Sequence, residues 1–213
     1  MVFHLWCMGS LPIHHKTIED GHLQMNTVEI NTPRSAHQVV EEKLTSLGLY
    51  VTALEAYEMW KADPERVKVL DVRMVEEYVF LGHAEGAVNI PVAFPKYQWH
   101  ADKRKYGFEI NPDFIDHVKE VFKPDDTIVA MCRSGGRSAF AINMLAKAGF
   151  VKVYNIIDGF EGDTVNDPES VFYGKRMKNG WKNSAPWTYD LDPKNVWVPT
   201  GEELDKLRTT LDV

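Results

Sequence analysis

Residues 127 to 140, TIVAMCRSGGRSAF, place a cysteine between an apolar run and a helical pattern. The run Thr127 to Met131 is short, β-branched and apolar, which is typical of a strand buried on both faces. The apolar residues that recur at helical spacing after Ser138 are Ala139, Phe140, Ile142, Met144, Leu145 and Ala148. The sequence therefore predicts that Cys132 occupies a strand-to-helix turn.

The residues that follow Cys132 favour a turn that binds an anion. Gly135 and Gly136 permit positive φ values, so that successive backbone N–H groups can point into one cavity beside a helix N-terminus. Arg133 and Arg137 add full positive charges. A helix N-terminus and nearby arginines lower the pKa of a thiol, so we expect Cys132 to act as a thiolate nucleophile. The alternative is a small buried hydrophobe, but two arginines would be costly neighbours in a dry core.

This turn resembles the active-site loop of the rhodanese family, the sulfurtransferases that carry sulfane sulfur on a cysteine persulfide. In that family a short loop curls round the sulfur of the cysteine. The other segments that carry the resemblance are Leu70-Asp71-Val72-Arg73, Glu77-Tyr78, Gly82-His83, Gly86-Ala87, Asn89-Ile90-Pro91, Val153-Tyr154-Asn155 and Asp158-Gly159-Phe160. Asp158 stands where the family more often has glycine, and we expect this departure to leave the chemistry unaffected.

The resemblance implies a rhodanese-like α/β fold with a mainly parallel central sheet and helices on both faces. The pattern of the chain agrees, because strand-like and helix-like segments alternate. The predicted strands are 67–72, 88–90, 127–131 and 153–157, and the predicted helices are 76–81, 112–122, one that starts at Ser138 and one in which Thr52 and Glu55 form a capping box. Ligands of such sheets bind beyond the carboxyl ends of the strands, where Cys132 is expected.

The resemblance and the local charge together assign the site. We predict that Cys132 becomes a persulfide whose outer sulfur is held by the residues that follow it, Arg133, Ser134, Gly135, Gly136, Arg137 and Ser138. The expected substrates are a small anionic sulfur donor such as thiosulfate and a thiophilic acceptor, which is cyanide, a thiol or a sulfur-accepting protein. The mechanism requires no metal and no organic cofactor.

Three further residues admit two interpretations each. Asp71 either anchors an arginine of the cysteine loop or caps the turn that follows it. Arg73 either adds positive charge near the substrate or pairs with Glu77 four residues later, and the second interpretation is preferred. His83 could act as a general base, but its glycine-rich surroundings favour a role in tying down a loop.

Two other functions are weighed against sulfur transfer. Cysteine-dependent phosphatases and the related arsenate reductases wrap an oxyanion with a Cys-x5-Arg loop, whereas Cys132-x4-Arg137 is one residue shorter and leaves less room for a phosphoryl group. Met131 also replaces the histidine that precedes the cysteine in many phosphatases. The other alternative is a rhodanese-type sulfur-relay or protein-interaction module with little thiosulfate activity.

Composition limits the partners and the compartment. The chain has 213 residues, of which 44% are hydrophobic and 26% charged, and a net charge of -7, which argues against a nucleic-acid surface. Its two cysteines, Cys7 and Cys132, cannot form a disulfide scaffold. No apolar run approaches the roughly 18 residues of a membrane span, and no basic and then hydrophobic leader is visible at the start. We therefore expect a cytoplasmic protein that does not bind a membrane.

The chain is expected to divide into three parts: a peripheral extension over residues 1–47, the rhodanese-like domain over 48–162, and an aromatic tail over 163–213. The extension holds several ligand-type residues, but their spacing fits no zinc pattern and a solvated segment is preferred; they are His4, Cys7, His14, His15 and His22. The tail contains Trp181, Trp187 and Trp197, which are costly to leave in water, so it is expected to pack on the domain.

An aromatic and basic insertion lies inside the predicted domain between Phe94 and Tyr106. It could line one rim of the pocket and attract an anionic donor, or it could be a solvated loop held by its aromatic residues. Both interpretations stay open at this point.

Overall fold

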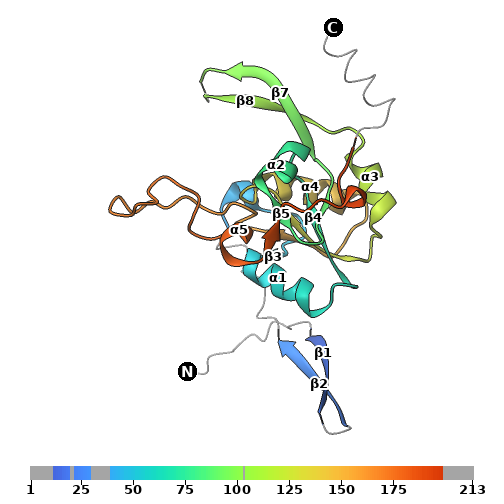
Figure 1. Cartoon of the computed structure of the whole chain (residues 1–213). Helices are drawn as coiled ribbons and strands as arrows, with labels where there is room; N and C mark the ends of the chain where they lie inside the picture. The colour runs from blue at the N-terminus through green and yellow to red at the C-terminus, as the bar shows by residue number, and fades with distance from the viewer. Residues whose placement is uncertain (1–11, 20–21, 30–38, 103, 199–213) are drawn as a thin grey trace, which may run out of the picture.

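A five-stranded parallel sheet forms the centre of the computed structural model, which describes residues 12–19, 22–29, 39–102 and 104–198 (Figure 1). In spatial order its strands are β3 (Tyr50–Val51), β10 (Val153–Ile156), β9 (Thr127–Met131), β4 (Val67–Asp71) and β6 (Val88–Asn89). All four neighbouring pairs run parallel. The predicted α/β class and the mainly parallel sheet are confirmed.

Helices cover both faces of this sheet, as predicted. One apolar cluster buries α3 (Phe114–Val121) and α4 (Gly136–Lys147) against residues of β4, β9 and β10. The other cluster contains buried residues of α1 (Ala53–Ala62) and α2 (Val75–Leu81) on the opposite face. Successive residues of β9 alternate between the two clusters, so this strand is apolar throughout because both of its faces are covered.

The ends of two helices follow from local chemistry. At the start of α1, the Thr52 hydroxyl accepts a hydrogen bond from the Glu55 N–H (3.3 Å), and the Glu55 carboxylate accepts one from the Thr52 N–H (2.6 Å). This confirms the predicted capping box. The helix α4 begins at Gly136, two residues before the predicted start, because Gly135 adopts the left-handed conformation and serves as its N-cap.

Two antiparallel hairpins were not predicted as strands. The insertion forms β7 (Ala93–His100) and β8 (Lys105–Ile110), which project from the body of the domain in Figure 1. Aromatic residues at alternate positions favour strands, but this preference depends on context, and the same sequence is also compatible with an irregular loop. In the extension, β1 (Pro12–Glu19) pairs antiparallel with β2 (His22–Glu29).

The candidate metal ligands of the extension lie outside what the structure describes. His4 and Cys7 belong to the undescribed residues, and the side chains of His14, His15 and His22 are likewise not described. The first described helix lies within the extension: it is the 3-10 helix η2 (Glu41–Lys43), which lies beside the N-terminal part of α4.

The residues after the last strand of the central sheet return to it. In α5 (Trp181–Ser184) the Trp181 side chain is fully buried in the same cluster as α1 and α2. Further on, β11 (Trp187–Thr188) pairs antiparallel with β5 (His83–Ala84), and a last 3-10 helix, η3 (Pro193–Asn195), precedes Trp197. In the described residues, no helix combines the length and the apolar character that crossing a membrane requires.

Candidate active site

The side chain of Cys132 lies at the carboxyl end of the central strand β9, just before α4. The Val72 N–H at the end of β4 donates a hydrogen bond to the Met131 carbonyl (2.9 Å), so the ends of β4 and β9 lie together as expected. Cys132 is only 1% exposed, and the Gly135 N–H donates to its Sγ at 3.2 Å. The turn therefore aims a backbone donor at the sulfur from the first residues of a twelve-residue helix.

A buried hydroxyl also faces the sulfur. The Oγ of Ser138 lies 3.6 Å from the Cys132 Sγ and 2.7 Å from the Oδ1 of Asn155. One hydroxyl proton serves one acceptor at a time, and the shorter contact favours Asn155. The Asn155 Nδ2 in turn donates to the carbonyls of Gly135 and Lys43, both at 3.1 Å. Asn155 thus holds the loop and η2 together. The Ser138 hydroxyl can donate its proton either to the Asn155 Oδ1 or to the Cys132 Sγ.

The backbone after β10 lies directly against the cysteine loop. The Phe160 N–H donates to the Cys132 carbonyl (2.8 Å), and the Glu161 N–H donates to the Arg133 carbonyl (3.0 Å). Gly159 makes this approach possible: its φ is +62°, and a Cβ there would lie 2.6 Å from the Cys132 carbonyl oxygen and the Ser134 nitrogen. The family-like segment around Gly159 therefore supports the loop through backbone contact.

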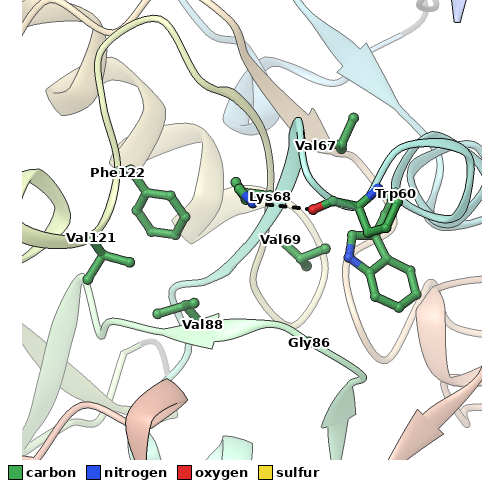
Figure 2. Close-up of a pocket in the computed structure, with 9 residues that line it drawn as sticks. Trp60, Val67, Lys68, Val69, Gly86, Val88, Val121 and Phe122 are labelled. Atoms are coloured by element: carbon green, nitrogen blue, oxygen red, sulfur yellow. Dashed lines mark hydrogen bonds between the residues drawn. The ribbon is translucent and has the colours of Figure 1, made fainter.

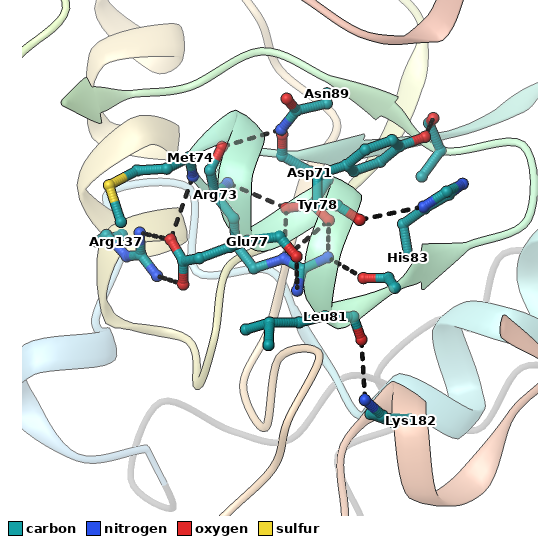
Figure 3. A network of polar contacts seen from close by, with 12 residues as sticks. Asp71, Arg73, Met74, Glu77, Tyr78, Leu81, His83, Asn89, Arg137 and Lys182 are labelled. Atoms are coloured by element: carbon teal, nitrogen blue, oxygen red, sulfur yellow. Dashed lines mark hydrogen bonds and ion pairs between the residues drawn. The ribbon is translucent and has the colours of Figure 1, made fainter. Parts of the chain in front are cut away.

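The second arginine of the loop is paired with a glutamate of α2 (Figure 3). The two terminal nitrogens of Arg137 bind the two carboxylate oxygens of Glu77 at 2.6 and 2.7 Å. Burial alone would raise the pKa of Glu77, but the hydrogen bond and charge of Arg137 outweigh it and leave that pKa below its usual value. Burial alone would lower the pKa of Arg137, and the same pair raises it instead. Glu77 therefore fixes Arg137 in place and neutralises much of its charge.

The contacts predicted for Asp71 and Arg73 are wrong in part. Arg73 is fully buried and forms its ion pair with Asp71 at 2.7 Å. Toward Glu77 it donates only to the main-chain carbonyl, at 3.5 Å, and its Nη2 also donates to the Gly82 carbonyl (Figure 3). Asp71 accepts from the Arg73 N–H, which caps the turn, but it contacts no arginine of the cysteine loop in these described residues. The prediction assumed that Arg73 and Glu77 lie four residues apart on one helix face. The chain after β4 is instead extended, and it brings the side chains of Asp71 and Arg73 together.

Arg133 differs from the other arginines of the site. It is exposed, and among the described residues it forms no ion pair. Its positive charge is therefore the one in the loop that no carboxylate of the described residues offsets. His83 has the predicted structural role, because its ring nitrogens lie 3.2 Å from the carbonyl oxygens of Tyr78 and Asp190.

Asp158, the departure from the family pattern, connects three segments around the loop. Its carboxylate accepts from the Ala53 N–H (2.8 Å) at the start of α1 and from the Gly180 N–H (2.9 Å) in the tail. Burial raises the pKa of this carboxyl although both N–H groups lower it. The main-chain N–H of the next tail residue, Trp181, donates to the Gly159 carbonyl at 2.9 Å. The tail thus braces the backbone that supports the loop.

A separate cavity with a mixed polar and apolar lining lies away from Cys132. It has a volume of about 390 Å³ and is lined by Trp60, Pro64, Val67, Lys68, Val69, Gly86, Val88, Val121 and Phe122 (Figure 2). Val67 and Lys68 begin β4, so this cavity is at the amino end of the strand and the cysteine loop is at the carboxyl end.

Within the described part of the chain, no group of three or more Cys, His, Asp or Glu side chains could hold a metal ion.

Comparison with known proteins identifies the family of this chain. The family model described as the rhodanese-like domain matches residues 52–164, and the chain belongs to this family. The match spans β4, the cysteine loop and the segment around Gly159, which are the parts that surround Cys132.

Two curated relatives and one solved structure illustrate the similarity. "Thiosulfate sulfurtransferase 16, chloroplastic" of Arabidopsis thaliana is 39% identical over 93 residues, which cover 44% of this chain and 70% of the relative. "Protein HIGH ARSENIC CONTENT 1, mitochondrial", also of Arabidopsis thaliana, is 37% identical over 93 residues, 44% of this chain and 50% of the relative. The crystal structure of Rv0390 from M. tuberculosis matches with a TM-score of 0.50 and 28% identity, and the match covers 66% of this chain and 96% of that one.

Sequence reasoning missed the roles of Glu77 and Asn155. Both residues belong to segments that resemble the family, but each was noted only as part of a pattern. No residue near Glu77 in the sequence indicates that its carboxylate binds an arginine 60 residues later in the chain. A polar residue inside an apolar strand, as Asn155 is in β10, was the available signal, because a buried amide requires partners.

Proposed function

We propose that this protein is a sulfurtransferase that moves sulfane sulfur through a persulfide on Cys132. The observation that carries the proposal is the donor aimed at the sulfur: the Gly135 N–H lies 3.2 Å from Sγ at the N-terminus of α4. A donor in this position stabilises negative charge on sulfur, both in the thiolate that attacks and in the persulfide that forms. Membership of the rhodanese-like family supports the same reaction class.

In the first half-reaction, the Cys132 thiolate attacks the outer sulfur of thiosulfate. The S–S bond of the donor breaks, its electron pair leaves with sulfite, and the enzyme keeps one sulfur as Cys132–S–S⁻. In the second half-reaction, cyanide or a thiol attacks that outer sulfur, and the electron pair of the broken S–S bond returns to Cys132. The electrons balance without an oxidant, a metal or an organic cofactor.

The residues around the sulfur divide this work. We assign the outer sulfur to the loop from Arg133 to Ser138, with the Ser138 hydroxyl free to turn from Asn155 toward the added charge. Arg133 attracts the anionic donor because it is exposed and unpaired among the described residues. Arg137 stabilises charge on the leaving sulfite, with its position set by Glu77. Asp71 and Arg73 support the loop from the end of β4 without touching the donor.

The test is a steady-state assay with thiosulfate as donor and cyanide as acceptor. The wild-type protein is expected to form thiocyanate with ping-pong kinetics, and the Cys132→Ser variant is expected to form none. Turnover that persists in Cys132→Ser, or initial-rate patterns that require both substrates to bind together, would rule out the persulfide route.

Arsenate reduction is the second candidate, because one relative has arsenic in its name. The short Cys132-x4-Arg137 interval disfavours it, as it disfavours phosphatase activity, since both oxyanions need a wider loop. Arsenate consumed with a thiol reductant, measured beside thiosulfate consumed by the same preparation, separates the two. Faster use of arsenate or of an aryl phosphate than of thiosulfate would favour this candidate.

The remaining assignments are expectations about the whole protein. A cytoplasmic location is proposed from the sequence alone, whereas two relatives carry the words chloroplastic and mitochondrial in their names. The division into an extension over 1–47, a domain over 48–162 and a tail over 163–213 is also proposed.

A further inference from the structure

The β7–β8 hairpin carries an apolar face that the rest of the described chain covers only in part. Residues that face each other across the hairpin point to the same side, and so do alternate residues along one strand. The pairs Trp99 with Tyr106 and Pro95 with Phe108 therefore share one face with Ile110. We call Trp99, Tyr106, Phe108 and Ile110 the aromatic face; each is between 50% and 55% exposed.

This amount of exposed apolar surface needs an explanation. A two-stranded hairpin is marginally stable in water by itself, and its stability usually requires that one face be packed against something else. Each member of the aromatic face keeps at least half of its surface exposed, on a hairpin that projects from the body of the molecule (Figure 1). A contiguous exposed apolar patch on a folded protein typically marks an interaction surface. The face is also on a projecting element, whereas small molecules bind in concave pockets.

The aromatic face borders the active site. The ring of Phe108 lies 5.5 Å from the guanidinium carbon of Arg137, the loop arginine held by Glu77. The neighbouring Ser138 places its hydroxyl 3.6 Å from the Cys132 Sγ. A macromolecule bound on the hairpin would therefore contact the rim of the cysteine loop as well.

Charge indicates which kind of partner fits. Residues 93–110 contain four basic and two acidic side chains, whereas the whole chain contains 24 basic and 31 acidic ones. The hairpin is thus a basic segment of an acidic protein, and the exposed Arg133 adds a further positive charge at the mouth of the site. Complementary charge around an apolar centre favours an acidic partner and speeds its association.

The arrangement of the side chains favours a protein over a single-stranded nucleic acid. Binding of single strands requires basic and aromatic groups on one surface. Here Lys96 is opposite Gly107, one position from the Pro95 and Phe108 pair, so it points to the other face of the hairpin. The aromatic ring on the Lys96 side, that of Phe94, packs against the ring of Trp197 with centroids 5.2 Å apart, and the arginine beside Phe108 is already paired with Glu77. The aromatic face therefore has no unpaired basic side chain of the hairpin's described pairs beside it, and Lys96 lies at its rim, as in a protein interface with an apolar centre and a charged rim.

We propose that the aromatic face docks an acidic protein whose cysteine exchanges sulfur with Cys132, an inference that rests on the proposed sulfur transfer. Cys132 is almost fully buried, but the outer sulfur of its persulfide lies about 2 Å farther out. The partner thiolate attacks this outer sulfur, the S–S bond breaks, and its electron pair stays on Cys132. The partner leaves as a persulfide, and no oxidant is consumed.

Synthetic peptides with one cysteine serve as probes. The first peptide surrounds the cysteine with leucine and glutamate, the second replaces leucine by serine, and the third replaces glutamate by lysine. The persulfide form of the wild-type protein is expected to transfer sulfur to the first peptide with a kcat/KM about tenfold above the other two, as loss of a central apolar contact predicts.

Two tyrosine variants separate docking from a general effect of the fold. Tyr106→Ser removes part of the aromatic face, and Tyr173→Ser removes a similarly exposed tyrosine (58% against 55%) from a different loop. Tyr106→Ser is expected to abolish the preference for the first peptide, and Tyr173→Ser to keep it. Transfer to cyanide should be the same in both variants, because cyanide does not need the hairpin.

Several results would overturn the proposal. These are equal rates with all three peptides, a preference that survives Tyr106→Ser, or an equal loss of cyanide transfer in that variant. In analytical ultracentrifugation, self-association that Tyr106→Ser removes would assign the face to a second copy of this chain. Tyr106-dependent binding of a labelled RNA oligonucleotide that is tighter than that of the first peptide would assign it to nucleic acid.

A binding measurement keeps this proposal separate from the proposed function. The first peptide with its cysteine replaced by serine is titrated by fluorescence anisotropy, which involves no sulfur chemistry. Tyr106-dependent binding in a protein that forms no persulfide would support docking and reject sulfur transfer. A protein that forms the persulfide but does not discriminate between the peptides would support sulfur transfer and reject docking.

Discussion

The cysteine loop and the β7–β8 hairpin are neighbours that are built in opposite ways. The cysteine of the loop is buried, and backbone from the β10 end, Asn155 and Glu77 hold the loop from three directions. The hairpin pairs mainly with itself and exposes its aromatic face. A substitution in or under the loop should therefore impair the chemistry or the fold, whereas one at the hairpin should change only the choice of partner.

The largest expected effect comes from Cys132. Cys132→Ser is expected to abolish sulfur transfer from every donor while the thermal unfolding midpoint changes little, because the side chains are similar in size. Cys7→Ser is the control, since no glycine-rich turn or arginine follows Cys7 in the sequence. Equal loss of activity in the two variants would show that the wrong nucleophile has been assigned.

Gly159 tests how tightly the loop is supported. Gly159→Ala places a Cβ 2.6 Å from the Cys132 carbonyl, whereas Gly174→Ala, also at positive φ, meets nothing within 4 Å. Both substitutions cost backbone strain, so their difference isolates the clash. We expect Gly159→Ala to be about 1 to 3 kcal/mol less stable than Gly174→Ala in urea unfolding, with most transfer activity lost. Equal stability and activity would mean that the loop tolerates a shift of its support.

Arg137 tests whether a paired arginine still acts on the substrate. Arg137→Ala is expected to slow the thiosulfate half-reaction about ten- to a hundredfold, because one charged contact is lost, and to affect the acceptor step less. The Arg137→Ala/Glu77→Ala double variant removes the carboxylate that the single variant leaves unpaired. Stopped-flow measurements should find most of the defect in the double variant as well. Full recovery there would mean that Arg137 serves only to neutralise Glu77.

A smaller effect concerns the pH dependence of stability. The pKa of Glu77 is lowered in the folded protein from 4.5, so its pair with Arg137 stabilises the fold above that pH. The contribution is lost as pH falls through the lower folded-state pKa. Glu77→Gln should therefore be about 1 to 3 kcal/mol less stable than wild type at pH 7, and the difference should shrink in acid. A difference that is constant from neutral to acid pH would contradict the role of charge.

The sequence predicts the loop better than its surroundings. The strand β9, the turn at Cys132 and the capping box of α1 follow from neighbouring residues, so local patterns suffice for them. Contacts between distant segments do not leave such patterns. The pair of Glu77 with Arg137 and the bonds of Asp158 to Ala53 and Gly180 depend on the packing of the whole domain.

The hairpin shows a second limit of prediction from sequence. Its residues alternate well enough for strands, but a hairpin that contacts its own domain only near its inner end leaves no clear difference in the sequence between a buried and an exposed face. The sequence therefore left open whether this insertion lines the site or is a solvated loop. In the structure, its inner end contacts Arg137 through Phe108, and its outer part is exposed.

Intact-mass spectrometry after thiosulfate treatment tests the persulfide most directly, because it needs no acceptor. Folded wild-type protein is expected to gain the mass of one sulfur atom, peptide mapping is expected to assign it to Cys132, and cyanide is expected to remove it. Cys132→Ser should gain nothing under the same conditions. A folded wild-type protein that gains no sulfur from thiosulfate or from any other sulfane donor would contradict the account.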